Sequence, residues 1–179
     1  AGADIKAKLA WDLVTGNPGV VVGVIDTGLD YTHSDFTTTG VITPEGIVTG
    51  PNVFVNPREI AGNGLDDDCN GRIDDVIGID VFNGTSHPFD DNGHGTHVSG
   101  TIGAVGNNSL GVVGVNWNVK ILPCKFLDST GNGSIADAVV CLDYLLDLKL
   151  NRGVNIVATN NSWGGGDYSQ ALYDAIDAQ

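Results

Sequence analysis

A continuous apolar run that ends in an aspartate is the feature that most constrains the fold. Residues 20–25 read VVVGVI and are followed directly by Asp26. An uninterrupted run of this length and β-branched content is typical of a strand buried on both faces, as in a parallel sheet. Residues 119–127 (VKILPCKFL) and 154–159 (VNIVAT) have the same character. The chain is therefore expected to build a sheet that is covered on both sides.

Helical patterns alternate with these runs. Ser134 stands before one of them with Asp137 three residues on, which is a plausible N-cap arrangement. Strands alternating with helices indicate an α/β fold with a mainly parallel sheet, and we expect three layers, α/β/α, in one domain over residues 1–179. The segments with helical spacing are 4–14, 94–105, 135–148 and 169–178.

Residues 37–92 break this alternation. The segment is long, rich in Gly, Asn and Asp, and only weakly periodic. Long irregular stretches inside compact domains are usually functional. We therefore treat 37–92 as an irregular insertion that has a role of its own.

Composition excludes several function classes. The formal net charge of −14, from 22 acidic and 8 basic residues, repels phosphate backbones, so no nucleic-acid partner is expected. No apolar run approaches the length of a membrane span, and no signal-peptide pattern opens the sequence. The glycine patterns of phosphate-binding loops and dinucleotide-binding turns are also absent.

The three cysteines, Cys69, Cys124 and Cys141, do not form a disulfide framework. Cys124 lies in an apolar run and Cys141 in a helical pattern, which favours small core residues over reactive thiols. A Cys124–Cys141 bridge is also compatible with the sequence, because their two elements are neighbours in the chain. The cysteines alone do not fix the compartment.

Two polar residues stand where a parallel sheet binds its ligands. Asp26 follows a strand at its carboxyl end, although this position alone also suits a loop-capping role. His94 lies in D-N-G-H-G-T-H-V-S-G at 91–100, between two glycines that allow close approach of backbone or substrate. A metal site would use His94 and His97, but the H-E-x-x-H arrangement is absent. We expect His97 to be buried and hydrogen-bonded.

Together, V-I-D-T-G-L-D-Y-T-H-S-D at 24–35 and H-G-T-H-V-S-G-T at 94–101 resemble the aspartate and histidine motifs of the subtilisin-like serine proteases, in the family's chain order. The resemblance runs from residue 10 to 179 and is weakest over 40–90. It implies that His94 is the general base toward a serine hydroxyl and that Asp26 accepts a hydrogen bond from its Nδ1.

The family's nucleophile motif (G-T-S-M-A-like) and oxyanion-hole motif (A-G-N-like) do not occur in this sequence. The serines of the recognised segments cannot replace the nucleophile, since they lie inside other motifs. We therefore expect the N-terminal part of a subtilisin-like catalytic domain, incomplete at its C-terminus and inactive without the remainder of that domain. The serines in question are Ser99, Ser109, Ser134 and Ser162.

Two further segments resemble the walls that line the family's polypeptide substrate. They are D-S-T-G-N-G-S at 128–134 and N-N-S-W-G-G at 160–165, and a substrate would pair between them as an added strand. Without the two motifs, their glycines would be ordinary loop glycines. By the resemblance, Ile135 and Trp163 line the pocket for the fourth residue before the scissile bond. The substrate-binding residues so implied are Gly131, Asn132, Gly133, Ile135, Ser162, Trp163 and Gly164.

G-N-N-S-L-G-V at 106–112 resembles the family's strong calcium loop, displaced by one residue from the commonest spacing. Side-chain and carbonyl oxygens in this mixture suit Ca²⁺. The ligands implied are Asp35, Asn108 and the carbonyls of Gly106, Leu110 and Val112.

A second Ca²⁺ site is predicted in D-D-D-C-N-G-R-I-D-D at 66–75, which follows the first nine positions of an EF-hand loop. Position twelve is Ile77 rather than Glu, so the loop is not a complete EF-hand. A solvated acidic turn is the alternative. The candidate ligands are Asp66, Asp68, Asn70, Arg72 and Asp74, with Gly71 at the turn.

The sequence therefore favours a serine endopeptidase of the subtilisin type that acts on polypeptides, binds Ca²⁺ and works outside the cell. The competing interpretation is a calcium-binding relative without catalytic activity. A G-T-S-M-A-like motif further along the parent protein would decide for the protease.

Overall fold

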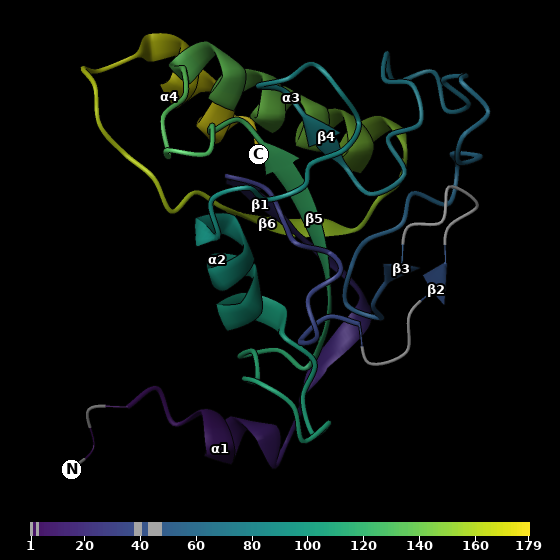
Figure 1. Cartoon of the computed structure of the whole chain (residues 1–179). Coiled ribbons are helices and arrows are strands. Elements are labelled where there is room, and N and C mark those ends of the chain that lie inside the picture. The colour runs from purple at the N-terminus through teal and green to yellow at the C-terminus, as the bar shows by residue number, and fades with distance from the viewer. Residues whose placement is uncertain (1, 3, 38–40, 43–47) are drawn as a thin grey trace.

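Figure 1 shows the chain as a computed structural model that describes residues 2, 4–37, 41–42 and 48–179. Outside residues 37–92, helices and strands alternate, as the sequence predicts. In chain order they are α1 (Ala7–Trp11), β1 (Gly16–Asp26), β2 (Val41–Ile42), β3 (Val48–Thr49), β4 (Ile79–Asp80), α2 (His94–Gly103), β5 (Asn118–Lys125), α3 (Ile135–Asn151), β6 (Ile156–Asn160) and α4 (Gln170–Asp177).

The main sheet has the strand order β4-β5-β1-β6, and every pairing in it is parallel. The central strand β1 is the apolar run that ends at Asp26, and Asp26 pairs in register with Lys125 at the end of β5. Both residues therefore lie at the carboxyl edge of the sheet. A separate antiparallel pair joins β2 to β3.

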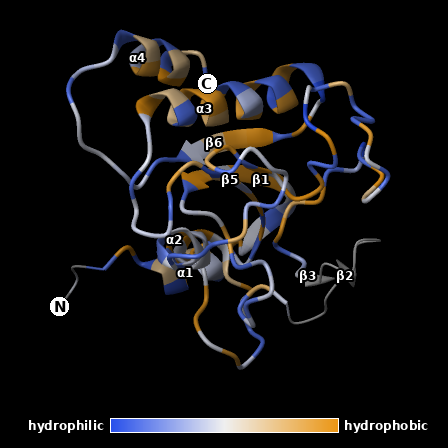
Figure 2. Cartoon of the chain, turned by 45° about the horizontal axis from the view of Figure 1, so that its top comes forward, coloured by the Kyte–Doolittle hydropathy of each residue, from blue (hydrophilic) through white to orange (hydrophobic). Residues whose placement is uncertain are grey.

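The sheet is covered on both faces, because β1 sends alternate side chains to opposite sides. Val21 and Ile25 belong to a core shared with α3 and α4, whereas Val24 belongs to a second core against α2. Figure 2 shows α3 and α4 on one side of β1, β5 and β6, and α2 on the other. The predicted three-layer α/β/α fold with a mainly parallel sheet is confirmed.

The predicted cap of α3 is also confirmed, since the Ser134 hydroxyl accepts a hydrogen bond from the backbone N–H of Asp137 (3.0 Å). The first helix is shorter than predicted. It covers only Ala7–Trp11 and buries none of its residues. Trp11 nevertheless anchors it, because its ring lies 5.1 Å from that of Trp117 and its Nε1 donates to the Val115 carbonyl (2.9 Å).

A disulfide joins Cys124 of β5 to Cys141 of α3, and both residues are fully buried. The sequence left open whether these two cysteines are free core residues or form a bridge, and the structure shows the bridge. It fastens α3 to the sheet within the larger core. Cys69 is free and exposed.

The segment 37–92 contributes to the core although most of its described residues are irregular. Phe54 donates its backbone N–H to the Ile121 carbonyl (2.8 Å), and Val53 forms a parallel bridge to Ile121. Val76 and Ile77 are buried in the core that faces α2. The segment is therefore packed against the sheet.

Among the residues that the structure describes, none of the helices has the length and apolar character that a membrane span requires.

Candidate active site

Asp26 and His94 meet at the carboxyl edge of the sheet. Asp26 Oδ1 lies 2.7 Å from His94 Nδ1 and also accepts the backbone N–H of Thr27 (2.7 Å). Asp26 is completely buried, whereas the His94 side chain is about half exposed (49%). A carboxylate in this position accepts a hydrogen bond from Nδ1–H, which holds the proton on Nδ1 and leaves Nε2 as the basic nitrogen of the imidazole. The predicted hydrogen-bonded pair is confirmed as a contact.

Two glycines let the aspartate and histidine segments approach this closely. A Cβ at Gly95 would stand 2.2 Å from the Gly28 carbonyl oxygen, so only glycine fits at this second position of α2. Gly28 has φ +114, and a Cβ there would lie 2.6 Å from the Pro88 carbonyl oxygen. Gly28 and Gly95 are thus required by the packing of the turn after Asp26 against the first turn of α2.

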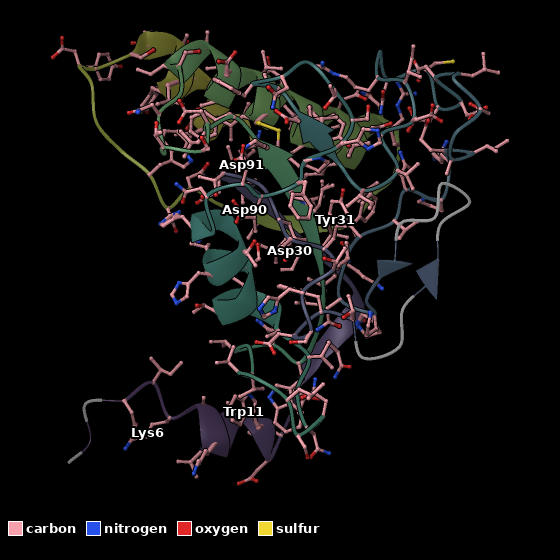
Figure 3. All side chains as sticks on the ribbon, viewed as in Figure 1. Lys6, Trp11, Asp30, Tyr31, Asp90 and Asp91 are labelled. Atoms are coloured by element: carbon pink, nitrogen blue, oxygen red, sulfur yellow. A yellow bond between two sulfur atoms is a disulfide. The ribbon has the colours of Figure 1, made fainter. Side chains whose placement is uncertain are left out.

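Asp90 fixes the same two segments by hydrogen bonds. Its Oδ1 accepts from the Thr27 hydroxyl (2.8 Å), Asn92 N (3.0 Å) and Gly93 N (2.9 Å), and its Oδ2 from the N–H (2.9 Å) and hydroxyl (2.6 Å) of Thr96. Burial disfavours the Asp90 charge, but these donors outweigh burial and lower the pKa of its carboxyl to about 2. Figure 3 shows Asp90 and Asp91 beside the start of α2.

Lys125, the last residue of β5, also connects these segments by hydrogen bonds. Its buried Nζ donates to the carbonyls of Thr27 (2.8 Å) and Leu127 (2.7 Å) and to Asp91 Oδ1 (2.7 Å). One ammonium therefore joins the ends of β1 and β5 to the loop before His94. The sequence motifs do not single out Asp90 or Lys125, because their importance arises from bonds between loops that only the fold brings together.

The segments predicted to bind substrate surround one hollow of about 250 Å³. Its floor is aromatic, since the ring of Trp163 lies 4.9 Å from that of Phe126 and Trp163 Nε1 donates to the Ile25 carbonyl (2.9 Å). Ser162 is absent from its lining and instead bonds Asn160 Oδ1 (2.8 Å). Of the predicted residues, the hollow is lined by Gly131, Asn132, Gly133, Ile135, Trp163 and Gly164.

In the described part of the chain, no hydrogen bond joins a serine hydroxyl to His94. Ser134 caps α3, and the Ser99 hydroxyl is buried inside α2 without a partner. Neither hydroxyl is therefore in described hydrogen-bond contact with His94.

The expectation for His97 is wrong. His97 is exposed and lines a hollow of about 620 Å³ together with Asp30, His33 and Thr96. The buried positions of α2 are Gly95, Ser99, Gly100 and Gly103, and His97 lies outside this set.

The comparisons with known proteins agree with this geometry. The model of the subtilase family matches residues 17–179. This chain belongs to the subtilase family. The subtilase chain is 42% identical over 155 residues to subtilisin-like protease 1 of Plasmodium berghei, covering 86% of this chain and 23% of that protein. It is 30% identical to a thermophilic serine proteinase of Bacillus sp. (strain AK1), covering 94% and 32%.

Among solved structures, a cold-adapted subtilisin-like serine proteinase superposes on the subtilase chain with a TM-score of 0.58 at 26% identity. The match covers 92% of this chain and 43% of that one. The fold is therefore subtilisin-like. The subtilase chain spans about a quarter of the length of the Plasmodium relative and less than half of the solved one.

The first predicted calcium loop of this subtilase wraps around Asp35. Val112 N donates to Asp35 Oδ2 (3.1 Å), while Asp35 Oδ1 is buried without a described partner. Asn108 Oδ1 accepts from Leu110 N (3.1 Å), and Val105 N donates to the Asp35 carbonyl (2.9 Å). The loop is thus in contact with its predicted carboxylate, and an orphaned buried oxygen fits a cation at this place.

The EF-hand-like segment is arranged differently from the prediction. Asp66 accepts the backbone amides of Asn70 (3.0 Å) and Gly71 (2.8 Å), and Asp74 Oδ2 accepts Gly64 N (3.0 Å). The Asn70 side-chain oxygen accepts Arg72 N (2.7 Å). Of the predicted carboxylates, the structure brings only Asp68 into a group of converging acidic side chains.

The other members of that group are Glu59 and Asp75, and the three ligand atoms lie within 4.8 Å of one another. Burial raises the pKa of Asp75 to about 6, and the nearby charges of Asp68 and Glu59 add to this, against the hydrogen bonds from Tyr144 and Asn70. The EF-hand pattern omits Glu59 because it lies outside the loop. It omits Asp75 because Asp75 holds none of the ligating positions.

Proposed function

We propose that this chain supplies the acid–base half of a serine endopeptidase. The single observation that carries the proposal is the 2.7 Å contact between Asp26 Oδ1 and His94 Nδ1 at the carboxyl edge of a subtilisin-like sheet. His94 Nε2 removes the proton from a serine hydroxyl as that oxygen attacks the peptide carbonyl, and then returns the proton to the leaving amine. Asp26 holds the tautomer and stabilises the imidazolium that forms in between.

The substrate is an extended polypeptide that lies between residues 131–133 and 162–164. Bare glycine backbone on both sides lets the substrate backbone approach as an added strand. The hollow over Phe126, Ile135 and Trp163 supports a subsite for a substrate side chain several residues before the scissile bond. Because two aromatic rings meet in it, we expect it to prefer apolar side chains.

The nucleophile and the oxyanion-hole donor come from a part of the protein beyond these residues. The relatives with protease names are two to four times longer than the matched segment, which supports a complementary C-terminal part of the same domain. Residues 1–179 alone are then inactive, because without a positioned hydroxyl there is no acyl-enzyme route.

Calcium is the cofactor we propose, and the loop at 106–112 is its first site. Asp35, Asn108 and the carbonyls of Gly106, Leu110 and Val112 would hold the ion, and the orphaned Asp35 Oδ1 supports this assignment. The ion supplies no chemistry to the peptide bond. It binds the loop to the residues that follow Asp26 and so stabilises the native fold.

We also propose that the protein works outside the cell. The Cys124–Cys141 disulfide supports an oxidising compartment. A relative from Xanthomonas campestris, 32% identical over 181 residues, is named an extracellular protease.

The test uses a fluorophosphonate probe, which reacts with an activated serine. The full-length protein should be labelled on a serine outside residues 1–179, and Asp26→Asn should lower kcat by about 10⁴-fold while the exposed control Asp167→Asn leaves it unchanged. Failure of the full-length protein to react would favour the calcium-binding relative without catalytic activity. Stoichiometric labelling of a serine within residues 1–179 would contradict the assignment of the nucleophile.

A further inference from the structure

Asn92 bridges two segments that the proposed reaction uses. Its side-chain Nδ2 donates to the Ser129 carbonyl (2.9 Å), which lies 37 residues further along the chain. Its Oδ1 accepts the backbone N–H of His94 (3.1 Å). One amide group therefore connects the backbone of the histidine to residues 128–134, which are proposed above as one wall of the substrate site.

The turn that receives this bond is closed by its own hydrogen bonds. Asp128 Oδ1 accepts from the N–H (2.8 Å) and the hydroxyl (2.7 Å) of Thr130 and from Asn132 N (2.9 Å). Backbone bonds from Asp128 N to the Asn132 carbonyl (2.8 Å) and from Gly131 N to the Asp128 carbonyl (3.0 Å) complete the turn. Ser129 lies inside it, so a bond that fixes the Ser129 carbonyl fixes the whole turn.

On the other side, Asn92 belongs to the loop that Asp90 joins to α2. The backbone N–H groups of Asn92 and Gly93 both donate to Asp90 Oδ1 (3.0 and 2.9 Å). Among the described hydrogen bonds, only the one from Asn92 Nδ2 joins residues 90–93 directly to residues 128–132. Without it, the two segments are no longer connected at this point.

Lys125 connects the same loop and turn from beneath. Its Nζ is buried and donates both to Asp91 Oδ1 (2.7 Å) and to the Leu127 carbonyl (2.7 Å), just before the turn. In Figure 3, the labelled Asp91 lies near the carboxyl end of β5. Two connections from different elements thus converge on one pair of segments, so the fold determines how these segments lie relative to each other.

We propose that Asn92 is a positioning residue through which substrate bound along residues 128–134 orders the backbone at His94. The inference rests on the proposed function. Binding energy from substrate residues remote from the scissile bond raises kcat only where it acts on the reacting groups. A displacement of about 1 Å at the reacting centre is enough to cost about 100-fold in rate. The Asn92 amide offers a direct path of two hydrogen bonds from the Ser129 carbonyl to the general base.

Asn92 also has a local role, because an Asn side chain that accepts the amide two residues on forms a turn by itself. Two substitutions separate this role from the proposed one. Asn92→Asp keeps an oxygen for the His94 N–H but has no donor for the Ser129 carbonyl. Asn92→Ala removes both bonds. Because Asn92 is exposed, neither change buries a charge or leaves a cavity.

The experiment compares two peptide substrates on the full-length protein. Both contain the same scissile bond, but the short one has two residues before it and the long one has four, so the long one extends further along residues 128–134. Both kcat and KM are measured per serine labelled by a fluorophosphonate probe, so misfolded protein does not count. The control is Asn151→Ala, which removes an exposed amide whose described side-chain bond is to Asp147 Oδ1 (2.7 Å), at the end of α3.

In the wild type and in Asn151→Ala, extension of the substrate should raise kcat. In Asn92→Asp this gain should be about threefold to tenfold smaller, which is the range that one hydrogen bond commonly contributes. Extension should still lower KM in this variant, because the turn at 128–132 is intact. Asn92→Ala should lose the same gain and should also have a lower kcat on the short substrate, because the His94 N–H loses its acceptor.

An equal fall in kcat for both substrates in Asn92→Asp would overturn the inference, since it would show a local role alone. A change confined to KM, or a wild type whose kcat does not depend on substrate length, would overturn it as well. In each of these cases the labelled serine shows that the proposed function stands. A full-length wild type that the probe does not label would instead refute the proposed function, and this inference would fall with it.

Discussion

Asp90 receives five hydrogen bonds that join the residue after Asp26 to the first turn of α2. Thr27 completes this link, because its hydroxyl donates to Asp90 and accepts the N–H of Gly95 (2.8 Å). Asp26 and His94 are therefore positioned by a third carboxylate that forms no described hydrogen bond with either of them. If the pair acts as proposed, such support holds it within the tolerance that catalysis needs.

We predict that Asp90 stabilises the fold in a pH-dependent way. Its pKa is about 2 in the folded chain and 3.8 without the fold, so its contribution is complete above pH 3.8 and is lost as the pH falls toward 2. The shift corresponds to about 2 kcal/mol of unfolding free energy.

Urea unfolding between pH 6 and pH 2 measures this contribution. The wild-type protein should lose about 2 kcal/mol more over this range than Asp90→Asn, which lacks the titrating group. Asp167→Asn, an exposed loop substitution, should follow the wild type. Parallel curves for the wild type and Asp90→Asn would contradict the prediction.

Single residues also show which contacts can be predicted from the sequence and which cannot. The Asp26–His94 contact could be predicted, because each residue carries a local motif and the sheet brings strand ends together. The grouping of Glu59 with Asp75 could not, since it depends on how an irregular loop folds over α3. The expectation that His97 is buried is wrong, because burial depends on what covers α2.

At the scale of elements, the Cys124–Cys141 bridge joins a central strand to the longest helix across 17 residues. A cross-link of this loop length restricts the unfolded chain and stabilises the fold by about 3 kcal/mol. We predict that the double variant Cys124→Ala/Cys141→Ala loses about this amount in a urea titration. Cys69→Ala is the matched control and should change stability by less than about 0.5 kcal/mol, because Cys69 is exposed and free. Equal stability of both variants would show that the bridge does not stabilise the fold.

The loop at 106–112 gives a second prediction for an element. If it binds Ca²⁺ through Asp35, the ion should add about 2.7 kcal/mol of stability at a hundredfold excess over its Kd. Calorimetric unfolding with Ca²⁺ and with excess chelator should therefore give different midpoints. In the Asp35→Asn variant the difference between the two midpoints should be smaller, because the ion at this loop no longer contributes. In the control Asp30→Asn, on the same stretch of chain, the difference should be unchanged. An unchanged difference in Asp35→Asn would exclude the loop as a site.

The strands and helices themselves follow largely from sequence periodicity. Apolar runs predict β1, β5 and β6, although β6 is buried only at Ile156 and is not the buried strand expected. Helical spacing predicts α2, α3 and α4 to within a few residues. The two-residue strand β4 is too short for any period, and it forms because Ile79 pairs with Cys124. The insertion's place in the core likewise depends on tertiary contacts of Val53 and Phe54 that no local pattern encodes.

At the scale of the whole molecule, the sheet is unevenly covered. β6 is its edge on one side, and Val157 on that strand is 57% exposed. Tyr173 and Ile176 of α4, which packs against α3, are also about half exposed. Unpaired edges with apolar side chains favour addition of another strand. Since the chain spans only part of the length of its relatives, we expect such a strand to come from the remainder of the protein.

We predict that the backbone amides of β6 exchange with solvent at different rates in the two forms of the protein. In residues 1–179 alone, the β6 N–H groups that do not bond β1 face water and should exchange quickly. In the full-length protein they should be protected, because the next strand accepts them. Amides of α3 at Leu142 and Leu145, which are fully buried, serve as the internal control and should be protected in both. Mass spectrometry of deuterated peptides that cover 154–163 measures the difference. Equal exchange of these peptides in both forms, with α3 protected in each, would show that β6 remains the edge of the complete sheet.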